Sequence, residues 1–145
     1  MALRGCTFEL GFGNVKDGSS EATAVHWQHV DPAQPTGGQV ELENCWLLGP
    51  GTGCRLTTLP RLVRLSNCLK TGSGPLLRAV ETTPSRRDVQ ILADHLTLRG
   101  ATAFLRREFS QESEEPGGAW LIQAEQCVFD LPPDSGAVFQ CVGPG

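Results

Sequence analysis

Six cysteines are the residues of this chain whose number first invites a chemical interpretation. They stand at positions 6, 45, 54, 68, 127 and 141. An even number would suit a disulfide framework in a small secreted protein, and thiolates are good ligands for zinc. However, no two of them form a CxxC pair, so the spacing of a zinc ribbon is absent. The residues around the cysteines indicate a structural role instead.

The segment VELENCWLL at residues 40–48 has a near copy, VRLSNC, at residues 63–68. Five such segments align when one row residue in each is taken as the origin. These row residues are Cys6, Cys45, Cys68, His95 and Cys127. The irregular intervals of 39, 23, 27 and 32 residues are typical of a solenoid that keeps its strands and varies its loops.

Within a unit, apolar residues stand five and three positions before the row residue, as in Val40 and Leu42 or Val63 and Leu65. They resume at the row residue and often two positions after it, as in Cys45 and Leu47. Both halves have the period of a β-strand, but the parity changes between them, which requires a bend. The residues immediately before the row residues are Gly5, Asn44, Asn67, Asp94 and Gln126. Gly, Asn and Asp tolerate left-handed backbone, so we expect the corner there, with the Cys as the first inward residue after it.

A third apolar segment follows each corner strand. These segments are residues 23–29, 54–59, 75–80, 102–109 and 137–142. Three short strands in each turn, joined by one fixed bend and two variable connections, predict a triangular all-β coil of about five turns.

The corner motif, repeated in ENCWL, SNCL, ADHLTL and EQCVF, resembles that of the right-handed parallel β-helix, the pectin-lyase-like architecture. The resemblance covers nearly the whole chain and implies a single domain over residues 1–145, which we expect to be part of a longer bacterial protein. This architecture hosts polysaccharide lyases, hydrolases, adhesins and autotransporter stalks, so it implies a fold rather than an activity. By the same analogy we expect an extracytoplasmic or cell-surface location.

Stacked row residues would lie about 4.8 Å apart on successive turns. A straight ladder does not offer the tetrahedral geometry that zinc needs, although neighbouring rungs could just permit a disulfide. We therefore expect reduced thiols that behave as small buried hydrophobic groups, with no metal and no cofactor. His95 is expected to be a buried histidine, on a different face from Asp94, so the two would form no acid–base pair.

No motif for nucleophilic catalysis is present. The sequence lacks a GxSxG elbow, and no serine has a motif that ties it to a base. Glycoside hydrolysis would need two carboxylates that face one cleft. The acidic residues Glu112, Glu114 and Glu115 instead read as a solvated loop. We predict no catalytic residues and leave the question of enzymatic activity leaning towards none.

Three arginines keep a nearly constant distance from their row residues. Arg55, Arg78 and Arg106 follow them by 10, 10 and 11 positions, and His26 and Gln140 are candidate continuations of this set. If all point outward, they form a basic stripe suited to a linear polyanion, because guanidinium groups make forked bonds to carboxylates and sulfates. The alternative is a solvated face whose arginines pair with acidic loop residues.

Composition limits the partners. With 12 Lys and Arg against 16 Asp and Glu, the net charge of −4 gives no basic field for nucleic acid, and no apolar stretch is long enough to span a membrane. Two function classes remain. The first is a non-enzymatic structural or interaction module of a larger protein, with another protein domain as its partner. The second is a carbohydrate-active domain that binds or cleaves an acidic polysaccharide through the arginine stripe.

Overall fold

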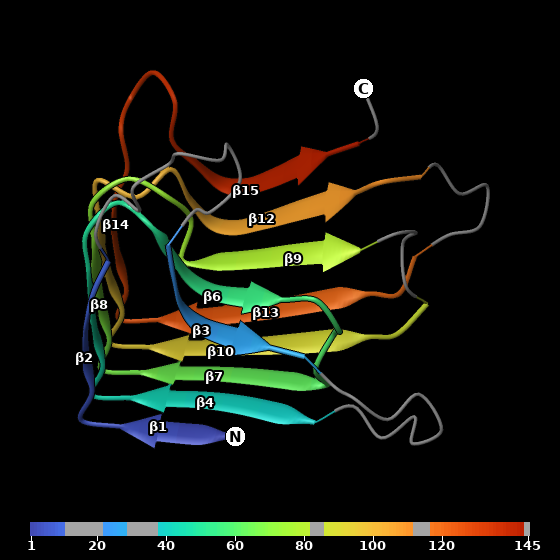
Figure 1. Cartoon of the computed structure of the whole chain (residues 1–145), viewed down its shortest axis with the longest axis horizontal. Helices are drawn as coiled ribbons and strands as arrows, with labels where there is room; N and C mark the ends of the chain where they lie inside the picture. Colours follow the sequence, from blue (N-terminus) through green and yellow to red (C-terminus); the bar gives the residue numbers. More distant parts are fainter. Residues whose placement is uncertain (11–21, 29–37, 82–85, 112–116, 144–145) are drawn as a thin grey trace.

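The computed structural model describes residues 1–10, 22–28, 38–81, 86–111 and 117–143. In these residues, β-strands form three parallel sheets of five strands each (Figure 1). Sheet A contains β1 (Ala2–Arg4), β4 (Gln39–Glu43), β7 (Leu62–Ser66), β10 (Val89–Asp94) and β13 (Trp120–Glu125). Sheet B contains β2 (Thr7–Glu9), β5 (Trp46–Leu48), β8 (Leu69–Thr71), β11 (Thr97–Arg99) and β14 (Val128–Asp130). Sheet C contains β3 (Thr23–Trp27), β6 (Thr52–Leu56), β9 (Leu77–Glu81), β12 (Ala103–Phe109) and β15 (Ala137–Val142).

The chain passes from sheet A to sheet B to sheet C and then begins the next turn. Each strand therefore pairs with the strand three places away in the sequence, and the fold is a right-handed parallel β-helix of five turns. The fold class expected from the sequence is confirmed. Within the described residues, no helical segment has the length and apolar character that a membrane-crossing helix requires.

Inward and outward side chains alternate along each strand. The inward apolar residues of successive turns stack into columns inside the coil. In sheet A, Leu42 pairs with Leu65, which pairs with Ala93, and at most 3% of each is exposed. Residues between them, such as Arg64, point to solvent. Burying a Leu side chain contributes about 1.5–3 kcal/mol, so these columns, repeated on all three sheets, hold neighbouring turns together.

The corner between sheets A and B is formed by a residue with left-handed backbone. The φ angles are 61° at Gly5, 54° at Asn44, 50° at Asn67, 51° at His95 and 51° at Gln126. At the corner, Asn67 Nδ2 donates a hydrogen bond of 2.6 Å to Asn44 Oδ1. This stacked amide pair compensates for backbone conformations that are unfavourable for residues with a Cβ atom.

His95 occupies this corner, which corrects the prediction that it would be an inward row residue. The inward residue of the fourth turn is Leu96, which is fully buried, whereas the His95 side chain is 59% exposed. The pairing of Asp94 with Ser66 and with Glu125 fixes this register. The physical reason is parity: with Leu96 as the row residue, the apolar residues on both sides of the corner, Ile91, Ala93 and Leu98, all take inward positions.

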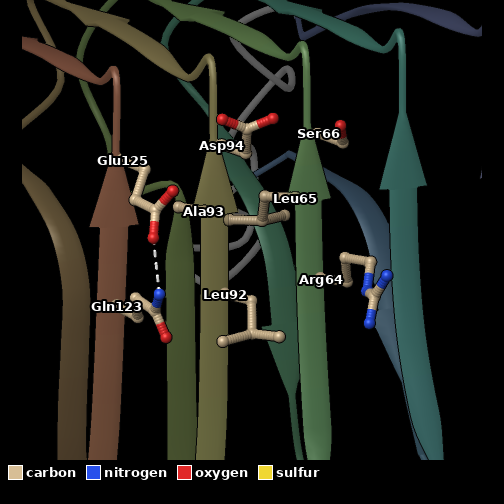
Figure 2. A pocket seen from close by; sticks show the side chains of 8 residues that line it. All are labelled: Arg64, Leu65, Ser66, Leu92, Ala93, Asp94, Gln123 and Glu125. Carbon is tan, nitrogen blue, oxygen red and sulfur yellow. Dashed lines mark hydrogen bonds between the residues drawn. The ribbon is translucent and has the colours of Figure 1, made fainter.

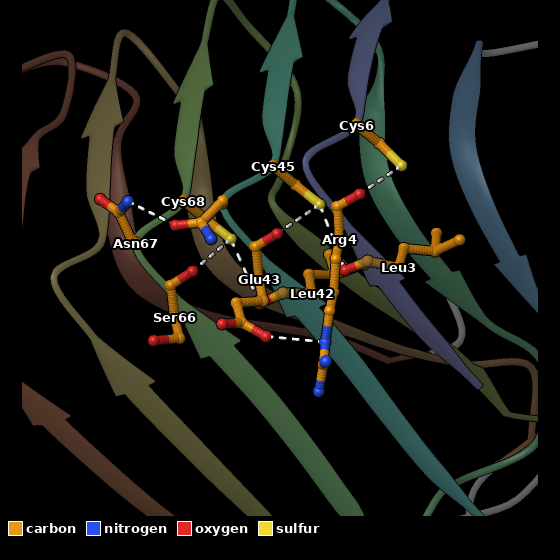
Figure 3. Close-up of polar contacts among 10 residues, drawn as sticks. Leu3, Arg4, Cys6, Leu42, Glu43, Cys45, Ser66, Asn67 and Cys68 are labelled. Atoms are coloured by element: carbon orange, nitrogen blue, oxygen red, sulfur yellow. Dashed lines mark hydrogen bonds and ion pairs between the residues drawn. The ribbon is translucent and has the colours of Figure 1, made fainter.

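The cysteines have a specific role just after the corner (Figure 3). The Sγ atom of Cys45 donates to Glu43 O at 3.4 Å and to Leu3 O at 3.5 Å. Cys68 repeats the arrangement one turn later, with Ser66 O at 3.3 Å and Leu42 O at 3.4 Å. Cysteine suits this position because its side chain is small and mostly apolar but its thiol is a weak hydrogen-bond donor. The thiol gives an additional hydrogen bond to backbone carbonyl groups near the end of the strand.

All six cysteines are unpaired. As expected, Cys45 and Cys68 are buried, whereas Cys6 and Cys127 are only half-buried. Cys6 lies in the first turn and Cys127 in the last, so each is covered by a neighbouring described turn on one side and not on the other. Burial raises the pKa of Cys68 and raises that of Cys54, in sheet C, to about 12.

The turn between sheets B and C uses glycine because two turns of the coil approach each other there. Gly49 has a φ of 112°, and a Cβ atom at this position would overlap the carbonyl oxygen of Leu10. Its amide donates to Thr71 O at 3.1 Å, one turn further along. Any side chain at position 49 would separate the two turns.

A lysine occupies an inward position beside this turn. Lys70 pairs with Leu47 and Leu98 in an apolar column and is fully buried. Its Nζ donates to Gly49 O and Thr71 O at 2.8 Å and to Gly72 O at 3.2 Å. Three carbonyl oxygens therefore replace the water that the ammonium loses on burial.

The third strands lie close to the predicted segments, and the 137–142 segment matches β15 at both ends. Most of the long connections expected at residues 31–38, 81–88 and 110–118 fall outside the described residues. The acidic run Glu112, Glu114 and Glu115 also lies outside them.

Candidate functional site

Sheet C brings the predicted basic residues into one row. In the order of the turns, the row consists of His26, Arg55, Arg78, Arg106 and Gln140. The residues on either side of Arg55 and Arg78 in their strands are fully buried, so these arginines point outward. Arg106 is equally outward and is 37% exposed. The row is thus a feature of the outer surface of sheet C.

An acidic residue on the same face neutralises part of this row. Glu108, two positions after Arg106 in β12, accepts hydrogen bonds through Oε2 from Arg78 Nε at 3.1 Å and Nη2 at 2.9 Å. Its Oε1 lies 2.6 Å from Arg106 Nε, at an angle that does not make a hydrogen bond. Because only 18% of the Glu108 side chain is exposed, this carboxylate binds its two cations in partly dehydrated surroundings.

The other members of the row differ in their contacts. His26 Nε2 lies 3.2 Å from the hydroxyl of Thr57. Gln140 donates to Thr102 O at 3.3 Å and to Ser135 O at 3.4 Å, so its amide group supports a turn. The Nε of Arg55 is buried and has no hydrogen-bond partner among the described residues. The Nε of Arg106 is likewise unpartnered, but Arg106 and Arg78 lie against Glu108, whereas no ion pair joins Arg55 to another described residue.

The outer face of sheet A has a shallow depression of about 270 Å³ (Figure 2). It lies over β7, β10 and β13 and is lined by five polar residues together with Leu65, Leu92 and Ala93. Gln123 Nε2 donates to Glu125 Oε1 at 2.6 Å. The carboxylates of Asp94 and Glu125 give this depression hydrogen-bond acceptors for a polar molecule.

Asp94 and His95 are in contact, contrary to the expectation that they would lie on different faces. His95 Nδ1 is 2.9 Å from Asp94 Oδ1 because the left-handed corner turns the imidazole back towards the strand end. More than half of each side chain is exposed. In the described part of the chain, no hydrogen bond joins the hydroxyl of Ser66, which also lines the depression, to this pair. The arrangement is a solvent-exposed contact between an imidazole and a carboxylate rather than a nucleophile bonded to a base.

Exposed apolar side chains gather on the last turn of the coil. Of the seven large hydrophobic residues that are exposed in the described chain, five belong to β13, β14 and β15. They are Leu121, Val128, Val138, Phe139 and Val142, with exposures from 37% to 61%. These three strands are also the terminal members of their sheets. Among the described strands, the last turn of the coil therefore combines exposed apolar residues with strand edges that no other described strand pairs.

The interior near this end contains an arginine. Arg107 belongs to the inward column of Ala79 and Cys141. Its Nη2 lies 3.2 Å from Oε1 of Glu81, and its guanidinium carbon lies 4.4 Å from the ring centre of Trp120. The Nε of Arg107 and the Nε1 of Trp120 are both buried without a hydrogen-bond partner. A cavity of about 180 Å³ adjoins both residues.

Within the described residues, no group of three or more His, Cys, Asp or Glu side chains is arranged to hold a metal ion. No protein-family model, curated protein or solved structure matches the chain. The inferences about function therefore depend on the surfaces described above.

Sequence reasoning did not identify two features of these surfaces. Glu108 could have been found, because a residue two positions after Arg106 in a strand lies on the same face. Arg107 gave no such signal, since an inward position of a coil is expected to be apolar. Its burial follows from stacking on Trp120 and pairing with Glu81, which only the fold brings together.

Proposed function

We propose that this chain is a non-enzymatic β-helical scaffold that acts as an interaction module of a larger protein. The observation that carries the proposal is the concentration of exposed apolar residues on β13, β14 and β15. Burial of each such side chain by a partner would contribute on the order of 1 kcal/mol or more, and unpaired strand edges are natural sites for association.

The finer assignment, a pectin-lyase-like repeat region of a bacterial surface protein, belongs to this proposal. It is supported by the corner motif with its left-handed Asn and inward Cys. The partner in this proposal is another protein domain.

Site-specific photo-crosslinking in cells that produce the protein tests the proposal. A photoreactive residue at Val128 should give a discrete adduct with another polypeptide. Trp46 provides the control, because it lies in the same outward column of sheet B, three turns away, and has a similar exposure of 54% against 57%. Equal labelling from both positions, or no adduct from position 128, would contradict the proposal.

A second candidate function is the binding of an acidic polysaccharide by sheet C. The observation that favours it is the alignment of Arg55, Arg78 and Arg106 in one outward row, with the Nε of Arg55 unpaired. Glu108 opposes it, because its carboxylate already binds two of the three arginines. Under this proposal, the ligand would bind at Arg55 and compete with Glu108 for Arg78.

Titration with heparin and with polygalacturonate at several salt concentrations tests this candidate. Binding should weaken steeply as salt rises, because exposed charges are screened over about 8 Å at physiological ionic strength. Arg55→Ala should weaken it, Arg55→Lys should restore it only partly, and Glu108→Gln should strengthen it. An affinity that does not respond to Glu108→Gln would remove sheet C as the binding face.

A further inference from the structure

Three cysteines occupy consecutive rungs of the inward row at the corner between sheets A and B. Cys6, Cys45 and Cys68 belong to the first, second and third turns (Figure 3). The carbonyl oxygen of Cys6 accepts a hydrogen bond from the amide of Trp46 at 2.8 Å, and that of Cys45 accepts one from the amide of Leu69 at 3.0 Å. These hydrogen bonds hold the three backbones in register, one above the next.

The thiols of this row repeat the same orientation. The Sγ atom of Cys45 lies 3.5 Å from Leu3 O, and that of Cys68 lies 3.4 Å from Leu42 O, so both point towards the turn that precedes their own. Burial raises the pKa of the Cys68 thiol, and the nearby thiol of Cys45 adds to the increase. The row is therefore a series of neighbouring sulfur atoms whose joint ionisation is unfavourable without a cation between them.

The other cysteines lack such a neighbour in the part of the chain that the structure describes. In the corner row, Cys127 follows Leu96, whose carbonyl oxygen accepts from the amide of Val128 at 2.8 Å. In sheet C, Cys54 stands between Val25 and Leu77. Stacked thiols are thus a property of the first three turns.

The spacing of the row suits a metal ion that takes two ligands in a straight line. Neighbouring strands of a sheet lie about 4.8 Å apart. A metal–thiolate bond is about 2.3 Å long, so a linear sulfur–metal–sulfur unit spans about 4.6 Å. A straight row cannot supply the tetrahedral ligands of zinc, but Cu(I) forms linear two-coordinate complexes, and soft thiolate ligands select it. Such an ion needs a pair of ligands rather than a group of three.

We propose that the row of Cys6, Cys45 and Cys68 binds Cu(I), with each ion held in line between two neighbouring sulfur atoms. Each ion displaces the protons of the thiols that it joins, and these protons pass to solvent. Its positive charge offsets one of the two negative charges that a pair of thiolates would otherwise bring into the interior. Cys45 belongs to both neighbouring pairs, so it is the essential ligand. This site is separate from the last turn of the coil, on which the proposed function depends.

Competition for Cu(I) between the reduced protein and bicinchoninate, under nitrogen, tests this proposal. The wild type should withhold Cu(I) from the chelator, and X-ray absorption should show two sulfur neighbours at about 2.3 Å. Cys45→Ala should lower the affinity about a hundredfold, because the sulfur atoms that remain are two rungs, or about 10 Å, apart and cannot share an ion. Cys68→Ala is the matched control. It also removes a buried thiol from the row but leaves the pair of Cys6 and Cys45, so it should still bind Cu(I).

A further variant separates loss of the site from loss of the fold. Cys45→Ser keeps the size of the side chain and a hydrogen-bond donor, so it should unfold cooperatively in urea and yet bind Cu(I) as weakly as Cys45→Ala. Equal affinities of Cys45→Ser and Cys68→Ala would overturn the proposal, as would coordination by three or more sulfur atoms. Loss of binding in Cys141→Ser would also overturn it, because the ion would then be held by the exposed thiol.

Discussion

The thiol of Cys54 should make the stability of the protein fall in mildly alkaline solution. Cys54 is fully buried in β6, and burial raises the pKa of its thiol from 9.0 to about 12. In the folded state the group stays protonated, whereas in the unfolded chain it ionises above about pH 9. The folded state therefore binds more protons in this range, so its stability is fully present below pH 9 and is lost as pH rises towards 12.

The size of this effect follows from proton linkage. Between about pH 7 and pH 10, the unfolded thiol gains about 1.4 kcal/mol from ionisation, and any folded pKa above about 11 gives nearly the same value. Urea unfolding of the wild type and of Cys54→Ala at both pH values isolates the contribution. The cavity left by Ala lowers stability at both pH values and cancels in the difference, as do the other cysteines, including Cys68.

We expect the wild type to lose about 1.4 kcal/mol more than Cys54→Ala between the two pH values. An identical loss in both proteins would refute the reasoning, because it would mean that the Cys54 thiol ionises as readily in the folded state as in water. Alkaline unfolding would then have to originate from other groups.

Three further outcomes are expected. Leu65→Ala, in a fully buried column, should lower the free energy of unfolding by about 2–5 kcal/mol, whereas the outward-facing Leu92→Ala should cost well under half as much in the same urea titration. Lys70→Met should lower the free energy of unfolding by about 2–6 kcal/mol in thermal or urea unfolding. At least two carbonyl oxygens at its turn lose their donor, and each unsatisfied oxygen costs about 1–3 kcal/mol. A stability equal to that of the wild type would show that the cost of burying the ammonium cancels these hydrogen bonds. In native protein treated with iodoacetamide, Cys141 should be alkylated first and Cys54 should react only after unfolding; rapid labelling of Cys54 would contradict its burial.

The fold could be predicted from the sequence because apolar residues alternate regularly within the strands and the alternation shifts by one residue at the corner. The parity change before Cys45 and Cys68 identified a corner, and three strands per turn followed from the spacing of the apolar segments. The fourth turn was misplaced by one residue because Asp94 was taken as the corner residue, in the place that Asn44 and Asn67 have in their turns. The parity rule itself, applied to Ile91, Ala93 and Leu96, would have placed His95 at the corner.

The surfaces were less predictable, and the reason is physical. The row of Arg55, Arg78 and Arg106 depends only on register, which repeats, so the sequence contained it. The partner of Arg78 depends on how Glu108 reaches across to the next strand, and the interior Arg107 depends on residues of two sheets. Such contacts form when different turns and sheets pack together. The sequence of one strand does not show which residues of other strands its side chains will contact.

The parallel pairing of the turns also determines how the coil should respond to mechanical tension. The covalent chain runs around the axis, whereas the hydrogen bonds between strands such as β4, β7 and β10 run along it. A force that pulls the two ends of the coil apart therefore loads the edge of the outermost turn before any inner turn. In a single-molecule stretching experiment, the protein should come apart at low force in successive steps, each releasing about one turn of chain. A single high-force event would show instead that the turns share the load.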